Sequence, residues 1–274
     1  MVDHLERPLV DKVRHALQTP SFRRMKRLEA RLYIPLYEED KEECNELVLE
    51  LAKIDFYLLQ RIHRKEVVEI CKWYHGLESP RKLFYARHRP TEAYFWALGV
   101  YYEPQYAKAR KLLAKFIATI TPYDDTFDNY GIWEELEPFS NVMQRWNMDE
   151  VEQLGECYKD FARFMFGTMI EIENALPEDI ARRNVDTIRD INIDSEHKTT
   201  KEEASEVLWN EVENAWKSMN HEYLSSTSIP SMLLIRVINL ARMMETMYKN
   251  IDGYTDSKIL KKWIHMFLDE PILF

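Results

Sequence analysis

Apolar side chains recur at helical spacing along most of the chain, and this periodicity constrains the fold more than any other feature. One such stripe comprises Leu47, Leu51, Ile54, Leu58 and Ile62. Another precedes an acidic cluster and comprises Ala109, Leu112, Leu113, Phe116, Ile117 and Ile120. Glycine contributes only 6 of the 274 residues, which leaves little material for tight β turns. We therefore predict an all-α fold, with about eight to eleven antiparallel helices joined by short loops and no convincing strand.

Proline and polar runs mark where these helices end. A break over residues 77–90 separates amphipathic helical segments from an aromatic one. Residues 178–200 are polar and show little apolar periodicity, and Pro230 suits the first position of the helix that follows. We expect residues 1–274 to form a single domain, with the segment 176–199 as its least regular part.

The charge balance argues against nucleic acid as a partner, because the formal net charge is −10. Residues 1–122 hold 22 Lys+Arg and 17 Asp+Glu, which gives +5, whereas residues 123–274 hold 15 and 30, which gives −15. Two such halves could line opposite sides of a site for a phosphate–metal complex. Ordinary surface charge explains the same division equally well.

The cysteines indicate a reducing compartment. Cys44, Cys71 and Cys157 are odd in number and widely separated, and they form no CxxC pair, so we expect free thiols and a cytoplasmic location. The sequence contains no apolar run long enough to cross a membrane, and its first residues lack a signal-peptide pattern.

A short acidic run, Tyr123-Asp124-Asp125-Thr126-Phe127-Asp128, is the first candidate for chemistry. On a helix, Asp124 and Asp128 lie on one face, one turn apart. Two convergent carboxylates suit Mg²⁺, which prefers oxygen ligands and shares them with water and substrate phosphates. Taken alone, the same pattern is also typical of a solvated acidic helix end.

Two further groups of residues point to a substrate that carries phosphate and forms a cation. Arg87 and Arg89 lie in a predicted loop, and Arg87 precedes Asp124 by 37 residues. The planar guanidinium group of arginine matches the geometry of phosphate oxygens. Aromatic faces stabilise a cation without offering a nucleophile, although most of the aromatic residues will serve core packing. The aromatic candidates are Trp73, Tyr74, Tyr94, Phe95, Trp96, Phe127, Tyr248 and Tyr254, the last two flanking Asp252 near a turn.

Together these segments resemble the plant class I terpene synthases, and the sesquiterpene cyclases among them most. The resemblance is carried by residues 86–106, 124–131 and 240–255, and it extends over most of residues 5–175 and 199–274. It implies the catalytic α-domain of that family, a helical bundle around a central cavity. Plant synthases usually carry a large N-terminal helical domain as well, and this chain has no counterpart of it.

The resemblance implies a role for each candidate residue. Asp124 and Asp128 would bind Mg²⁺ ions, or Mn²⁺ in their place, that bridge a prenyl diphosphate, with Asp125 in support. Arg87 and Arg89 would take up the released diphosphate. His88 stands where the family often has Asp. Substrate would also contact the aromatic wall and the cavity floor, formed by Trp73, Tyr74, Tyr248, Asp252 and Tyr254.

The family's second metal motif, (N/D)Dxx(S/T)xxxE, has no clear counterpart here. The interval from Asp124 to Tyr254 is shorter than the family requires, and the shortfall falls around residues 176–199. An omitted segment, a trimmed chain, or a substitute site made of Asp186, Asp190 and Asp194 would each account for it. Omission or trimming is our preferred explanation.

We therefore expect a magnesium-dependent terpene synthase, a carbon–oxygen lyase that ionises farnesyl diphosphate and cyclises the carbocation. One alternative is a catalytically impaired or non-catalytic terpene-synthase scaffold. Another is a monoterpene synthase that uses geranyl diphosphate. A binding module for an acidic helical partner is the third, and it predicts a large exposed apolar patch. In each case we expect a monomer.

Overall fold

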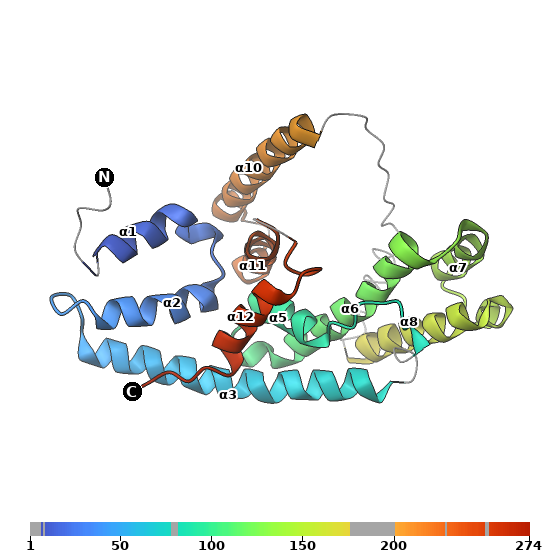
Figure 1. Ribbon diagram of the computed structural model, residues 1–274, viewed down its shortest axis with the longest axis horizontal. Helices are drawn as coiled ribbons and strands as arrows, with labels where there is room; N and C mark the ends of the chain where they lie inside the picture. Colours follow the sequence, from blue (N-terminus) through green and yellow to red (C-terminus); the bar gives the residue numbers. More distant parts are fainter. Residues whose placement is uncertain (1–6, 8, 78–81, 176–200, 228, 250–251) are drawn as a thin grey trace.

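The computed structural model describes residues 7, 9–77, 82–175, 201–227, 229–249 and 252–274, and in this part of the chain all regular structure is helical (Figure 1). The α-helices are α1 (Leu9–Gln18), α2 (Lys26–Glu38), α3 (Glu46–Gly76), α5 (Pro90–Val100), α6 (Ala107–Asp125), α7 (Trp133–Arg145), α8 (Glu156–Ala175), α10 (Lys201–Ser225), α11 (Ser231–Tyr248) and α12 (Lys258–Leu268). Short 3₁₀ turns are η2 (Ser21–Arg23), η3 (Pro104–Tyr106) and η5 (Met148–Gln153), and η4 (Thr126–Tyr130) is a π turn. The predicted all-α class is confirmed for these residues.

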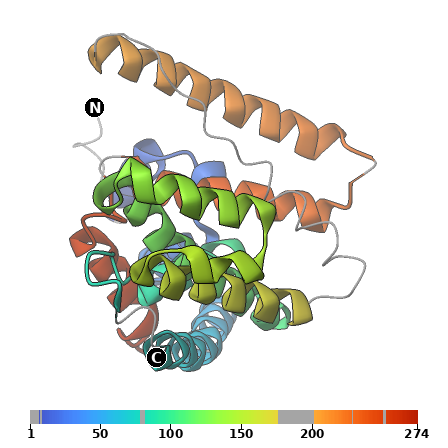
Figure 2. The same ribbon diagram turned by 90° about the vertical axis from the view of Figure 1, so that its right-hand side faces the viewer.

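Helix α3 runs along the lower edge of the molecule in Figure 1 and is seen nearly end-on at the bottom of Figure 2. The Asn45 side chain begins it by accepting hydrogen bonds from the backbone N–H groups of Leu47 (3.1 Å) and Val48 (3.2 Å). From there the helix continues without interruption to Gly76.

The apolar stripe that signalled this helix does not lie in the core. Leu47 is 77% exposed, Leu51 67% and Leu58 52%. The buried face holds Phe56 together with polar side chains, including Gln60, whose amide donates to the carbonyl oxygens of Phe267 (2.8 Å) and Glu270 (3.0 Å). A polar group can occupy a core position when such partners satisfy it.

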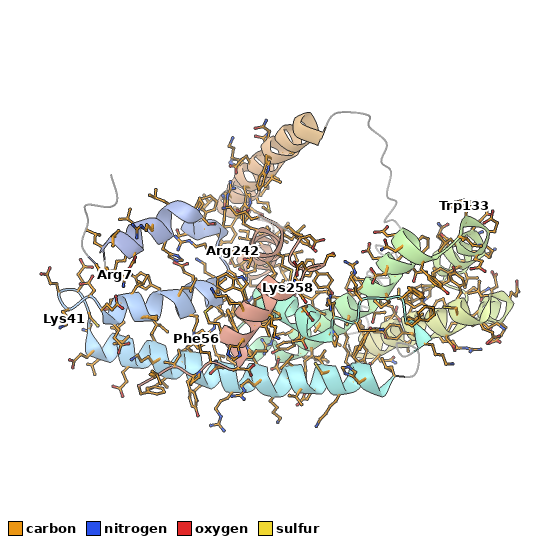
Figure 3. All side chains as sticks on the ribbon, in the orientation of Figure 1. Arg7, Lys41, Phe56, Trp133, Arg242 and Lys258 are labelled. Carbon is orange, nitrogen blue, oxygen red and sulfur yellow. The ribbon has the colours of Figure 1, made fainter. Side chains whose placement is uncertain are left out.

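Phe56 marks the place where three helices meet (Figure 3). Its ring lies 5.9 Å from the ring of Phe267 on α12, and the guanidinium of Arg27 on α2 stands 4.2 Å above it. Arg27 also donates to Asp55 at 2.9 Å. Stacking over an aromatic face and pairing with a carboxylate let a cation lie buried at this junction.

Helix α5 is the central helix of the core. Ala93, Tyr94, Phe95, Ala97 and Leu98 are all completely buried. A fully enclosed ion pair closes the layer that α5 forms with α3 and α6. Arg110 of α6 binds Glu66 of α3 through two hydrogen bonds of 2.7 Å, and the hydroxyl of Tyr94 donates to the same carboxylate at 2.9 Å.

Helix α11 lies against the C-terminal end of α5. Gly99 permits the close approach, because a Cβ atom there would come within 2.5 Å of the Met243 sulfur. Arg236 donates to Glu103 (2.8 and 3.0 Å), and Asn239 donates to the carbonyl oxygen of Val100 (3.1 Å). Helix α10 lies above α11 in Figures 1 and 2, and it is joined to η2 by the pair between Glu213 and Arg23 (2.5 and 2.6 Å) and by Trp216, whose ring meets that of Phe22 edge to face at 5.8 Å.

Candidate active site

The acidic run lies where α6 changes into the π turn η4. The hydroxyl of Thr126 donates to the Pro122 carbonyl oxygen (2.6 Å), and the N–H of Gly131 closes the turn on the Thr126 carbonyl oxygen (2.7 Å). Asp125 is 2% exposed, whereas the side chain of Asp124 is 63% exposed and Asp128 is also exposed. The three carboxylates of one short run therefore occupy two different environments.

Arg87 accounts for the buried carboxylate. Its backbone N–H and its Nε each donate to a different oxygen of Asp125 at 2.6 Å, and Nη2 donates to Asp124 at 3.1 Å. Nη1 donates to the hydroxyl of Thr255 at 2.6 Å. Partial burial lowers the pKa of Arg87, but the hydrogen bond to Asp125 and the negative charges of Asp125 and Asp124 together outweigh it, so that the pKa is raised. One guanidinium thus joins the 82–89 loop, the end of α6 and the turn after α11.

Arg89 has a different environment from Arg87. Its Nε lies 4.0 Å from the nearest oxygen of Glu92, and this buried nitrogen has no hydrogen-bond partner among the described residues. A buried donor without a partner is costly, and an anionic ligand would satisfy it. Of the two predicted arginines, Arg89 is therefore the one with donor capacity to spare.

The turn that follows α11 is organised by Asp252. One carboxylate oxygen accepts the backbone N–H groups of Tyr254 (3.0 Å) and Thr255 (2.9 Å), which is an Asx turn. Partial desolvation opposes ionisation of Asp252, but these donors outweigh it and lower its pKa. Asp252 therefore lies beside the two tyrosines because its carboxylate holds the turn together.

Trp96, Tyr248 and Tyr254 form an aromatic cluster next to this turn. The Trp96 ring lies 5.4 Å from that of Tyr254 and 6.0 Å from that of Tyr248, both edge to face. Tyr254 is 6% exposed, and this burial raises the pKa of its hydroxyl. The same hydroxyl shares a 2.7 Å hydrogen bond with Thr121 of α6. Tyr248 is 40% exposed. The predicted tyrosine pair therefore divides into one packed member and one open member.

The predicted aromatic wall at the end of α3 is also divided. Tyr74 is 2% exposed, and a 3.0 Å hydrogen bond joins its hydroxyl to Nδ1 of His88 in the arginine loop. Burial raises the pKa of Tyr74. Trp73 instead donates to Glu171 of α8 (3.1 Å) and lines a groove of about 300 Å³ with Phe164 and other α8 residues. Tyr74 is therefore linked to the arginine loop, and Trp73 belongs to the α3–α8 contact.

Asp124 and Asp128 have the chemistry that a hard divalent cation requires. Partial burial and the nearby charge of Asp128 raise the pKa of Asp124, and Arg87 partly opposes this. A cation between the two carboxylates would remove their repulsion. No group of three or more potential metal ligands occurs in the described ranges, so two carboxylates are what this run offers. That set fits Mg²⁺, which completes its shell with water and phosphate oxygens.

Sequence reasoning missed several residues of this site. Thr255 and Thr121 hold Arg87 and Tyr254, and the ring of Tyr85 stacks on Tyr130 at 3.7 Å while its hydroxyl binds Thr126 (2.9 Å). The Asp-x-x-Thr spacing at residue 252 signals an Asx turn, but no local pattern links Thr255 to Arg87. The candidate substitutes for the second metal motif, Asp186, Asp190 and Asp194, lie outside the described residues, as does the segment 176–199.

Comparisons with known sequences agree on one family. Residues 75–252 match the terpene synthase family, metal binding domain. The curated (+)-δ-cadinene synthase isozyme XC1 of Gossypium arboreum is 32% identical over 368 aligned residues, which cover 99% of this chain and 66% of that protein. Sesquiterpene synthase 2 of Toona sinensis is 30% identical with the same coverage. The chain thus spans just under two thirds of the length of these relatives.

Solved structures confirm the fold. A limonene synthase with 2-fluorolinalyl diphosphate superposes with a TM-score of 0.86 at 22% identity, over 99% of this chain and 68% of that one. The isoprene synthase of grey poplar leaves, in complex with three Mg²⁺ ions and dimethylallyl-S-thiolodiphosphate, gives 0.82 at 23% identity, over 99% and 71%. The architecture is that of the class I terpene synthase helical bundle, as predicted. No helix in the described ranges is long and apolar enough to span a membrane.

Proposed function

Because this chain belongs to the terpene synthase family, we propose that it binds a prenyl diphosphate together with Mg²⁺ and ionises it, as the catalytic domain of a sesquiterpene cyclase. The allylic C–O bond breaks, its electron pair leaves with the diphosphate, and the carbocation cyclises before losing a proton or capturing water. The family is one of lyases, and the activity of this chain is the proposal.

One observation supports this proposal above the others. At the end of α6, two exposed carboxylates lie beside a loop that carries one fully engaged arginine and one arginine with an unpartnered buried nitrogen. A solvated acidic helix end, the alternative reading of the acidic run, needs neither arginine. A site for a metal-bound diphosphate needs carboxylates for the metal and arginines for the phosphate oxygens, side by side.

The residues divide the work as follows. Asp124 and Asp128 would hold Mg²⁺, which supplies charge neutralisation of the leaving diphosphate when bound. Arg89 donates to phosphate oxygens. Arg87 positions Asp124 through Nη2 and keeps Asp125 from competing for the cation. Trp96 and the two tyrosines present aromatic faces, and the hydrogen bond between the hydroxyls of Tyr254 and Thr121 fixes the orientation of Tyr254.

Farnesyl diphosphate is the substrate that we propose, since the curated relatives at about 30% identity are named sesquiterpene synthases. Geranyl diphosphate is the alternative, and one neighbouring fold is a limonene synthase. Mn²⁺ is proposed as a substitute metal. The single-domain organisation of residues 1–274 and a cytoplasmic location stay proposals, the latter supported by three free thiols.

A specific observation favours a second candidate, a non-catalytic terpene-synthase scaffold. Helix α11 exposes an apolar face that ends at Tyr248, so one side of the aromatic cluster is open to water. A carbocation needs a dry cavity. The second metal motif is also not found in the sequence.

The decisive experiment incubates the chain with farnesyl or geranyl diphosphate and MgCl₂, and measures released diphosphate and volatile products by mass spectrometry. Calorimetric titration with inorganic diphosphate, with and without Mg²⁺, measures binding independently of turnover. The cyclase predicts Mg²⁺-dependent binding and product formation. The scaffold predicts no product, whether or not diphosphate binds.

The matched variants are Asp124→Asn with Asp128→Asn, and Asp149→Asn as a control carboxylate in η5. The first pair should lose at least tenfold in Mg²⁺-dependent diphosphate affinity, about 1.4 kcal/mol, and the control should lose none. Equal binding by all of these proteins would remove the metal assignment.

A further inference from the structure

The exposed stripe of α3 is an apolar surface that the proposed catalytic site does not use. It lies on the outermost helix at the lower edge of Figures 1 and 2. All of its members are exposed, from 37% to 77%, and it comprises Leu47, Leu51, Ile54, Leu58 and Ile62. Ridges of this spacing form the seam of two packed helices.

The stripe has the same spacing when read in either direction. The centre of symmetry is the point between Ile54 and Asp55. Leu47 and Ile62 lie equally far from this point on either side, and Leu51 and Leu58 form a second such pair closer to it. A second copy related by a two-fold axis at this midpoint would therefore place Leu47 against Ile62 and Leu51 against Leu58, with Ile54 beside Asp55 at the axis. A surface that is complementary to itself in this way is what an isologous dimer requires.

The charges beside the stripe have the matching polarity. Glu46 and Glu50 are exposed in its first half, and Arg61 and Arg64 are exposed in its second half. Antiparallel pairing places the acidic half of one copy against the basic half of the other, with Glu50 near Arg61. Parallel pairing would place like charges together, which is unfavourable.

From these observations we propose that two copies of this chain associate through α3, antiparallel, with the two-fold axis beside Ile54. The proposal goes beyond the proposed catalytic function and does not depend on it. It replaces the monomer that we expected from the sequence.

Two neighbouring features support the interface. Asp55 lies near the proposed axis, where two like charges would meet, but each is already paired with Arg27 of its own chain at 2.9 Å. The rings of Tyr57 and Phe274, 6.0 Å apart and both exposed, widen the apolar surface beside the stripe. A seam of this length belongs among small interfaces, near ~1,200 Å² in total, so the dimer should form in a concentration-dependent way.

The test is sedimentation equilibrium of the full chain across a range of concentrations. Glu50→Arg alone and Arg61→Glu alone each turn two symmetric attractions into repulsions, and should raise the dimer dissociation constant about tenfold. The double variant carrying both changes should recover the original constant. Leu17→Ser, a change at an equally exposed leucine of α1, should have no effect.

Orientation is tested by mild oxidation of single-cysteine changes. Ile54→Cys lies at the axis and should form an intermolecular disulfide, whereas Leu47→Cys, which faces Ile62 of the second copy, should not. The unchanged chain, with its own three thiols, sets the background. Circular dichroism confirms that each variant is folded.

Three results would overturn the proposal. The chain could remain monomeric at all concentrations, which would leave the stripe for a segment or partner of different chemistry. The charge-swapped double variant could fail to recover association. The Leu47→Cys chain could crosslink as readily as the Ile54→Cys chain, which would indicate parallel or non-specific contact.

Discussion

The two sides of the aromatic cluster are built in opposite ways. On the α3–α5–α6 side, apolar residues fill the interior, and the buried ion pair between Arg110 and Glu66 closes it. On the α11 side, the buried face carries Arg236, Asn239 and Arg242. Its exposed face comprises the apolar residues Leu233, Val237, Leu240, Met244 and Tyr248.

This difference shows what each side still lacks. Between α3, α5 and α6 the interior is closed, since Arg110, Glu66 and Tyr94 satisfy one another and the apolar residues of α5 are enclosed. Helix α11 is attached through polar bonds together with the buried side chains of Ile238, Met243 and Met247, while an apolar stripe at heptad spacing stays in contact with water. The stability of the domain should therefore depend on the first side, and a closed cavity would require a further wall on the second.

The largest expected effect comes from breaking the buried ion pair. Arg110→Met leaves the Glu66 carboxylate enclosed without its partner, so the free energy of unfolding should fall by about 4 kcal/mol. Urea denaturation followed by circular dichroism measures it. Lys111→Met, which removes the exposed pair with Glu69, should change stability by less than about 0.5 kcal/mol. Similar losses of unfolding free energy for both variants would contradict the claim that the buried ion pair contributes more than the exposed one.

Two adjacent residues of α11 test whether its apolar stripe is open to water. Ile238 is 5% exposed and Val237 is 56% exposed. Ile238→Ala should cost about 3 kcal/mol because it leaves a cavity, and Val237→Ala should stay within about 0.5 kcal/mol. If Val237→Ala proved as costly as Ile238→Ala, the α11 stripe would be covered in solution and the open wall would be disproved.

The pH dependence of stability should also come from the packed side. Burial, together with the charges of Arg110 and Arg27, lowers the pKa of His63 to about 3. The unfolded chain takes up this proton near pH 6.5 and the folded chain does not, so stability should fall as pH drops from 6.5 towards 3. The loss by pH 5 is about 2 kcal/mol. His63→Gln should flatten this slope in urea titrations, and an unchanged slope would show that His63 is not its source.

The smallest expected effect is at the junction between the two sides. Thr255→Val removes the hydroxyl that accepts from Arg87 and should lower stability by about 1 kcal/mol or less. In the Mg²⁺-diphosphate titration, affinity should fall more than stability does if Thr255 positions Arg87. Thr246→Val is the control, since it removes only a bond within α11. Equal binding by both variants would limit Thr255 to a structural role.

The helical class followed from sequence periodicity, yet the apolar stripe that carried this signal in α3 is not the buried face of the helix. The buried face carries Gln60, His63 and Glu66, which a count of apolar residues passes over. Their partners come from α12, from the segment before η3 and from α6, so the reason they can be buried is not local. We attribute the apolar character of the exposed α3 stripe to the contact with a second copy that we propose above.

The candidate site was assembled from residue types, and its geometry required the fold. Aspartates and arginines at these positions indicated a phosphate–metal site, and the structure brings Arg87 to Asp124 and Asp125. The sequence did not distinguish Arg87 from Arg89, because the distinction depends on Thr255, which lies 168 residues away from Arg87. The roles of Trp73 and Tyr74, adjacent in sequence, also diverge only once α8 and the arginine loop are in place.

Asp125 holds the main chain and the side chain of one residue at the same time, since both the N–H and Nε of Arg87 donate to it. The loop therefore cannot move away from the end of α6 unless both bonds break together. In kinetic terms, the amide hydrogen of Arg87 exchanges with solvent only when the acidic run separates from the loop. Its exchange rate therefore measures how often the loop that carries Arg87 and the acidic run at the end of α6 come apart.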